Sequence, residues 1–163
     1  METFMFNEIP KSVEELQALP EAVLDSPYKT AALALLVLCN YKKSRENTFA
    51  MLDFLKGPAP LNPFEKQFLD DRLKGKEYKP FSYFAGAADA NEYTPNRPYT
   101  ITVSETPYSF QNENWATLYI RSSGADSPRP MKLRLKPSTN QWFLNEIQCL
   151  ADIRIPKSQD PWA

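Results

Sequence analysis

Residues 31–39 read Ala-Ala-Leu-Ala-Leu-Leu-Val-Leu-Cys and contain no polar side chain. A helix built from such a run has no polar stripe to turn toward water, so other elements must cover it on every side. The run is also too short to cross a bilayer, which takes roughly 20 apolar residues. We therefore expect a wholly buried central helix, from about Pro27 to Tyr41, with neighbours packed around it.

Start and stop signals predict three or four short helices in residues 1–75. Ser, Thr, Asp and Asn favour helix starts because their side chains accept early backbone N–H groups, and Gly favours helix ends. In the fourth helix, an apolar face of Phe64, Phe68, Leu69 and Leu73 is predicted. The predicted caps are Ser12, with Glu15 completing a capping-box pattern, Ser26 before Pro27, Ser44 before Arg45–Lys56, and Asn62 before Pro63.

Beyond Pro98 the apolar period changes to two, which is typical of half-buried strands. The alternating segments begin at Tyr99, Trp115, Met131 and Gln141, and Phe81–Phe84 is a candidate edge strand. We predict one α+β domain over residues 1–163. An N-terminal cluster of three or four short helices (1–75) packs on a C-terminal antiparallel sheet of four or five strands, and an aromatic connection in 76–163 joins them.

Several function classes are excluded by what the composition lacks. The sequence has no histidine, which removes Ser-His-Asp and Cys-His catalysis and His-ligated metals. With 4 glycines, neither GxGxxG nor GxxxxGK[ST] is present. Two cysteines are too few for a cysteine zinc site, and no secretory signal is visible, so we expect a cytoplasmic protein without cofactor, metal or membrane span.

Ser26-Pro-Tyr-Lys29 matches the Ser-x-x-Lys pattern of penicillin-recognising acyl enzymes, but the companion elements of that fold are absent. Helix capping explains the same residues, and we expect no nucleophile at Ser26.

Aromatic residues crowd the stretch from Tyr78 to Tyr119, and the 85–98 loop in it is long enough to be functional. These rings either seal the join between helices and sheet or form a recognition surface. Five cations against Asp126 leave residues 121–136 at +4, which favours a phosphate or acidic partner on an outward sheet face, or else simply a solvated face. The candidate binding residues are Tyr93, Arg97, Tyr108, Asp126, Arg129, Lys132 and Arg134.

Several segments resemble a bacterial family of uncharacterised single-domain proteins, from about Leu19 onward. They are Lys56–Leu61, Phe64–Leu73, Pro98–Val103, Gly124–Arg129, Gln141–Leu144 and Asp160–Ala163. The resemblance implies a bacterial or phage-type cytoplasmic protein and assigns no catalytic role. Element order alone also looks like the cone-shaped nuclear-transport-factor-like fold, which would place a pocket between sheet and helices, lined by some of Tyr83, Tyr99, Trp115, Tyr119 and Trp142.

Three functions remain open. The first is a non-catalytic binding protein that uses the aromatic and cationic surface for an unknown protein or a small anionic ligand. The second is a pocket protein or histidine-free enzyme of the cone-shaped fold, with a desolvated Glu146 or Asp152 as base. The third is an oligomeric scaffold, with a homodimer in which strands pair. We do not expect a nucleic-acid partner, because the net charge is −1 and the patch lacks a glycine-flexed loop.

Overall fold

Each α-helix begins where the sequence supplies a side-chain acceptor. The computed structural model describes residues 1–163 and places helices at Val13–Gln17 (α1), Pro27–Leu38 (α2), Arg45–Lys56 (α3) and Pro63–Leu73 (α4). The side chains of Ser12, Ser26 and Ser44 accept the backbone N–H groups of Glu15, Tyr28 and Asn47. Asn62 and Glu65 form a complete capping box at α4. The four predicted N-caps are therefore confirmed, but the Glu15 side chain does not complete the capping box predicted at Ser12. No helix is both long and apolar enough to cross a membrane.

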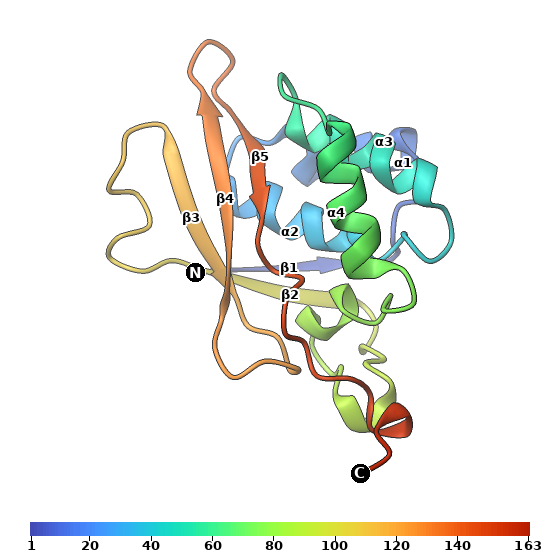
Figure 1. The fold of residues 1–163 in the computed structure, drawn as a ribbon. Helices are drawn as coiled ribbons and strands as arrows, with labels where there is room; N and C mark the ends of the chain where they lie inside the picture. Colours follow the sequence, from blue (N-terminus) through green and yellow to red (C-terminus); the bar gives the residue numbers. More distant parts are fainter.

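Five strands form one antiparallel sheet in the order β1-β2-β3-β4-β5. They are Glu2–Phe6 (β1), Tyr99–Ser104 (β2), Trp115–Ile120 (β3), Arg129–Lys136 (β4) and Gln141–Ile147 (β5). Only two residue pairs join β2 to β3, Val103 with Ile120 and Ser104 with Tyr119. The sheet therefore bends sharply there, and Figure 1 shows β1 and β2 running across β3, β4 and β5. The predicted α+β class and antiparallel meander are confirmed.

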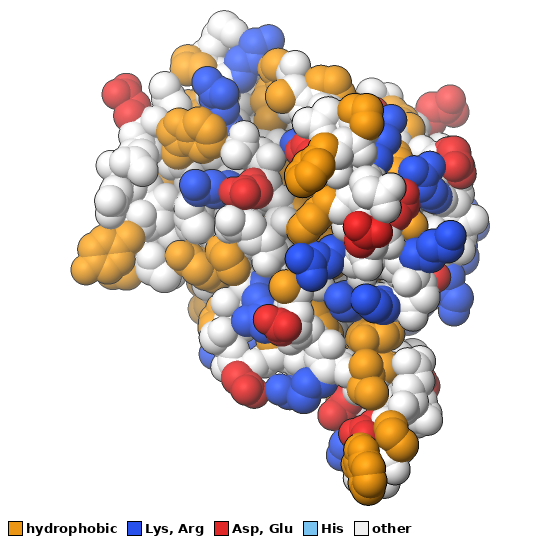
Figure 2. Space-filling model, in the orientation of Figure 1, with side chains coloured by type: hydrophobic (Ala, Val, Ile, Leu, Met, Phe, Trp, Pro, Cys, Tyr) orange, Lys and Arg blue, Asp and Glu red, His pale blue; other side chains and the backbone are white.

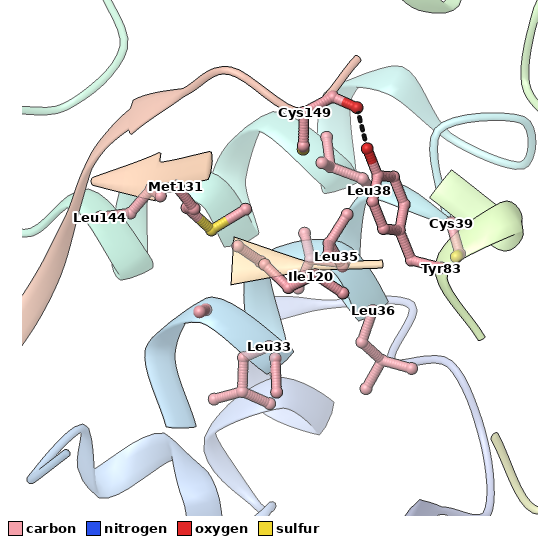
Figure 3. Close-up of a cluster of buried hydrophobic side chains, with 14 of the residues drawn as sticks. Leu33, Leu35, Leu36, Leu38, Cys39, Tyr83, Ile120, Met131, Leu144 and Cys149 are labelled. Carbon is pink, nitrogen blue, oxygen red and sulfur yellow. Dashed lines mark hydrogen bonds between the residues drawn. The ribbon is translucent and has the colours of Figure 1, made fainter. Parts of the chain in front are cut away.

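Helix α2 fills the inner side of this bend. It contacts α3 and strands β2 to β5, and every residue from Ala31 to Cys39 is at most 4% exposed. Figure 3 shows Leu35 and Leu38 on the side of the helix toward Ile120 and Met131 of the sheet, while Leu33 and Leu36 point the other way. The expected full enclosure of the apolar run is confirmed. The α-helix ends at Leu38, and turns continue the chain to Tyr41 and beyond.

Two local predictions are wrong. The segment Pro80–Tyr83 is a 3₁₀ turn and not an edge strand, because Pro80 occupies the first helical position and Ser82 Oγ donates to the carbonyl of Lys79. The edge strand is instead β1, whose Phe4 and Phe6 are buried while Met5 is exposed. On α4, Phe64 is 80% exposed and does not join the core, although Leu69 and Leu73 do.

Candidate binding surface

The alternation along β4 sends cations to one side of the sheet and apolar side chains to the other. Met131 and Leu133 are fully buried against the helical side, while Lys132, Arg134 and Lys136 are exposed. This alternation follows from the two-residue period of a strand. The cations of β4 therefore lie on the face of the sheet that no helix covers, which is the outward face predicted from the alternation in the sequence.

Strand β3 puts aromatic side chains beside those cations. Trp115 pairs in register with Arg134, and Thr117 with Lys132. The Arg134 guanidinium lies 5.0 Å from the centroid of the Trp115 ring, a cation–π contact. We call Trp115, Thr117, Tyr119, Lys132 and Arg134 the outer face. Figure 2 shows hydrophobic and Lys/Arg side chains next to one another over β3 and β4.

No ion pair neutralises the cations of the outer face. Neither Lys132 nor Arg134 forms an ion pair. Glu146 of β5 lies opposite Lys132 in register, and its carboxylate accepts a hydrogen bond from Gln148 Nε2 at 3.1 Å. The surface is thus cationic on balance, with one carboxylate at its border.

A cleft of about 480 Å³ opens between the outer face and the 105–114 loop. The loop is held in place by hydrogen bonds, including Thr106 N–H to Ser109 Oγ at 2.9 Å and Thr117 N–H to the Ser109 carbonyl at 3.0 Å. Phe110 anchors the loop by packing near Tyr28 and Trp142. Tyr108 is left 75% exposed. The cleft is lined by Tyr108, Ser109, Gln111, Asn112, Trp115, Thr117, Tyr119 and Lys132.

Three predicted site residues therefore come together, Tyr108 and Lys132 in this cleft and Arg134 beside it. The others lie elsewhere. Tyr93 is only 1% exposed, stacks on Tyr78 with ring centroids 5.4 Å apart, and donates to the Arg154 carbonyl at 2.7 Å. Burial raises the pKa of the Tyr93 hydroxyl. Its role is to pack the 85–98 loop and not to present a surface.

Arg97 lies over the Tyr99 ring at 4.9 Å and lines a second open cleft of about 560 Å³. That cleft also carries Lys42, Glu77 and Glu92, so its charges are mixed. Arg97 is thus separate from the outer face, although the two clefts are similar in size.

Asp126 and Arg129, two of the candidate binding residues, each contact other parts of the protein and not each other. Asp126, whose side chain is 97% exposed, pairs with Arg154 at 2.9 Å. Arg129 turns instead to the Asp152 carbonyl at 3.2 Å and to Ser127. Asp152 and Arg154 belong to the C-terminal segment 149–154, which pairs with no strand. The contacts of Asp126 and Arg129 therefore hold the 121–129 loop against this segment.

The irregular segment 149–154 depends on side chains to satisfy its carbonyl groups. Tyr83 donates to the carbonyl of Cys149, as the dashed line in Figure 3 shows, and Lys79 Nζ donates to that of Leu150 at 2.8 Å. A buried backbone carbonyl without a partner is costly, so these donors hold the segment in place. Burial lowers the pKa of Lys79 and raises that of Tyr83. Sequence reasoning missed both residues, because their partners are distant in the chain.

Side chains of the types used in catalysis are either engaged with other groups or buried. Lys29 pairs with Asp25 at 2.7 Å, while Ser26 caps α2, so the Ser-x-x-Lys pattern is a helix start. Both cysteines are free and buried, and burial raises the pKa of each thiol. No group of three or more Cys, Asp or Glu side chains could hold a metal ion.

The side chains expected to line a pocket of the cone-shaped fold do not converge. Trp115 and Tyr119 point to the outer face, whereas Tyr83 is buried against the C-terminal segment and Trp142 packs near Phe110. The space between sheet and helices is filled by α2.

Comparison with known proteins gives a family and no more. Neither a curated protein nor a solved structure matches the chain. A family model described as "Domain of unknown function (DUF6935)" matches residues 8–157, nearly the whole sequence from α1 to the end of the C-terminal segment. The chain therefore belongs to this family of proteins with a domain of unknown function.

Proposed function

We propose that the protein is a non-catalytic binding protein that holds a small anionic ligand on its outer face. The observation that carries the proposal is the juxtaposition on β3 and β4: unpaired Lys132 and Arg134 stand directly beside Trp115 and Thr117 on a face without a helix. Aromatic rings supply contact area and cations supply attraction to an anion, and both are placed by rigid strands.

The same surface would be unusual as plain solvated exterior. Tyr108, Trp115 and Tyr119 line one cleft, and none of the three packs against another ring. Tyr108 is exposed and the other two rings are half-buried. Apolar area gathered in one place is a mark of binding sites, whereas single exposed rings are ordinary. The hydrogen-bonded loop that carries Tyr108 also favours a built cleft over a chance one.

The competing functions have weaker support. The enzyme hypothesis needs a desolvated carboxylate, and Glu146 and Asp152 are both exposed. The scaffold hypothesis needs a free strand edge. At β5, Leu24, Thr30 and Lys56 hydrogen-bond to the outer backbone groups. Strand β1 pairs only with β2, so a dimer built by strand pairing would have to use β1.

Native mass spectrometry of the protein purified from its own host tests the proposal. We expect a bound anionic mass on the wild type that is lost from the double variant Lys132→Ala/Arg134→Ala. The matched control is Lys43→Ala/Lys74→Ala, which removes the same charge from exposed positions outside the outer face. An adduct that both double variants retain, or a wild type without any adduct, would contradict the proposal. The same spectrum counts subunits, and a dimer would favour the scaffold.

We further propose that the protein works in the bacterial cytoplasm. Two free, buried thiols support this, because disulfides form and persist in oxidising compartments and are rare in the cytosol. Fractionation of host cells, with detection by antibody, tests it, and recovery from the periplasm or medium would contradict it.

A further inference from the structure

We infer that the ligand of the outer-face cleft is a mononucleotide, whose base lies against the aromatic rings and whose phosphate meets Lys132 and Arg134. This inference rests on the proposed function and names its ligand. Four kinds of group line or border the cleft: aromatic rings, side-chain amides, hydroxyls and cations. Each matches one part of a nucleotide.

The rings offer flat surfaces for a base. Trp115, Thr117 and Tyr119 alternate along β3, so the two rings are about 13 Å apart along the strand, at roughly 3.3 Å per residue. Tyr108 stands across the cleft on its loop. Stacking of a base on an aromatic ring tolerates any base, because every base has a π face. Arg134, already stacked on Trp115, adds a planar cation to the same platform.

The amides and one hydroxyl of the cleft have no partner within the protein. The side chains of Gln111, Asn112 and Thr117 line the cleft and make no intramolecular hydrogen bond. A side-chain amide presents a donor and an acceptor together, which suits the edge of a base, and a hydroxyl suits a ribose. Ser109 is already engaged with Thr106 and serves the loop instead.

The charge of the cleft fits one phosphate better than a long polyanion. Lys132 is the one charged residue that lines it, and no carboxylate does. Arg134 lies beside it on β4, while Glu146 marks the border on β5. The protein as a whole has a net charge of −1, which opposes a long nucleic acid. A cleft of about 480 Å³ lies in the usual range for small ligands.

The second large cleft serves as an internal comparison. It is of similar volume, but it mixes Lys42 and Arg97 with Glu77 and Glu92. A phosphate would meet carboxylates there, so the outer-face cleft is the better site for an anion.

Titration calorimetry with AMP, adenosine, ribose 5-phosphate and a dT12 strand as separate probes tests the inference. If both halves of the nucleotide are bound, AMP binds at least about tenfold more tightly than adenosine and than ribose 5-phosphate. Tyr119→Ala removes one stacking surface and weakens AMP binding about tenfold or more. The double variant Lys132→Ala/Arg134→Ala brings the affinity for AMP down to that for adenosine. Phe64→Ala, which removes an exposed ring from α4, leaves AMP binding unchanged, and circular dichroism checks that each variant folds.

Three outcomes overturn the inference. Equal binding of ribose 5-phosphate and AMP would show that the rings hold no base. Binding of a dT12 strand without binding of AMP would show a strand-binding surface instead. If no probe binds but the host-purified protein still carries an adduct that depends on Lys132 and Arg134, the ligand is not a nucleotide and the proposed function stands. Failure of both experiments would remove the proposed function as well.

Discussion

The two faces of β3 and β4 are made by alternate residues of the same strands, and they differ in every physical respect. On the inner face, Ala116, Leu118, Ile120, Met131 and Leu133 are at most 1% exposed. On the outer face, half-buried rings and exposed cations have neither a helix above them nor an ion pair between them. One face contributes to the free energy of folding, and the other adds little to it.

The difference teaches that stability and the proposed binding role fall on different residues of the same strands. Leu133 and Lys132 are neighbours in the chain, yet the first packs in the core and the second lines the cleft. Substitutions at adjacent positions can therefore separate the two roles, which makes the comparison testable.

The largest loss of stability is expected on the inner face, from Leu133→Ala. Truncating a fully buried leucine removes apolar contacts and leaves a cavity, which costs about 2–5 kcal/mol. Urea unfolding measures it. A loss below about 1 kcal/mol would mean that the inner face is loosely packed, and the contrast between the faces would fail.

Tyr83→Phe is expected to cost less, about 1–3 kcal/mol, because the Cys149 carbonyl is left buried without its donor. The substitution keeps the ring, so packing changes little. Thermal unfolding of wild type and variant gives the difference. Unchanged stability would show that water replaces the hydroxyl and that segment 149–154 is less enclosed than the inner face.

Asp70→Asn tests an intermediate case, a half-buried group between α3 and α4. Arg45 bonds Asp70 Oδ1 at 2.8 Å and Tyr41 donates to the same oxygen at 2.6 Å. The hydrogen bonds from Arg45 are the main reason that the pKa of Asp70 is lowered. A lowered folded-state pKa gives stability that is present above the unfolded value, about 3.9, and lost as the pH falls through the folded value.

The variant is therefore less stable than wild type at pH 7, by less than Tyr83→Phe because Arg45 is partly exposed. The difference shrinks below about pH 4. Urea unfolding at pH 7 and pH 3 measures it, and a difference that grows as the pH falls would reverse the assignment of Asp70 as a stabilising anion.

The smallest effect on stability is expected on the outer face, where Lys132→Ala changes the free energy of unfolding by no more than about 0.5 kcal/mol. Because the ammonium has no ion-pair partner, its removal breaks no salt bridge. Urea unfolding beside Leu133→Ala gives a direct comparison. A loss as large as that of the leucine variant would show that the outer face contributes to folding after all.

Much of the fold could be predicted because it rests on local rules. Ser12, Ser26, Ser44 and Asn62 begin helices by reaching backbone groups two or three residues away, so their signal lies in short stretches of sequence. The enclosure of α2 followed from its own composition. Strand β1 was not predicted, although Phe4, Met5 and Phe6 alternate between buried and exposed. Two buried positions are too few to indicate a strand on their own.

The candidate site was less predictable, because it depends on contacts across the sheet. The alternation of β4 placed Lys132 and Arg134 on the outward face, as expected. Only the register of β3 against β4 brings Trp115 and Thr117 beside them, and no local rule fixes that register. The contacts of Arg129 and Tyr93 could not be predicted for the same reason, since the carbonyl groups that accept their hydrogen bonds belong to the distant 149–154 segment.

The pairing of β1 with β2 has a consequence for the order of assembly. Phe6 and Tyr99 are partners in the sheet, but residues 7–98, and with them all four α-helices, lie between them in the chain. Closing so long a loop costs conformational entropy. The few contacts of a five-residue strand offset little of that cost until the helices have folded and brought the two ends of the loop together. We therefore expect Glu2–Phe6 to dock last during refolding, which pulse-labelling hydrogen exchange would show as late protection of its amides.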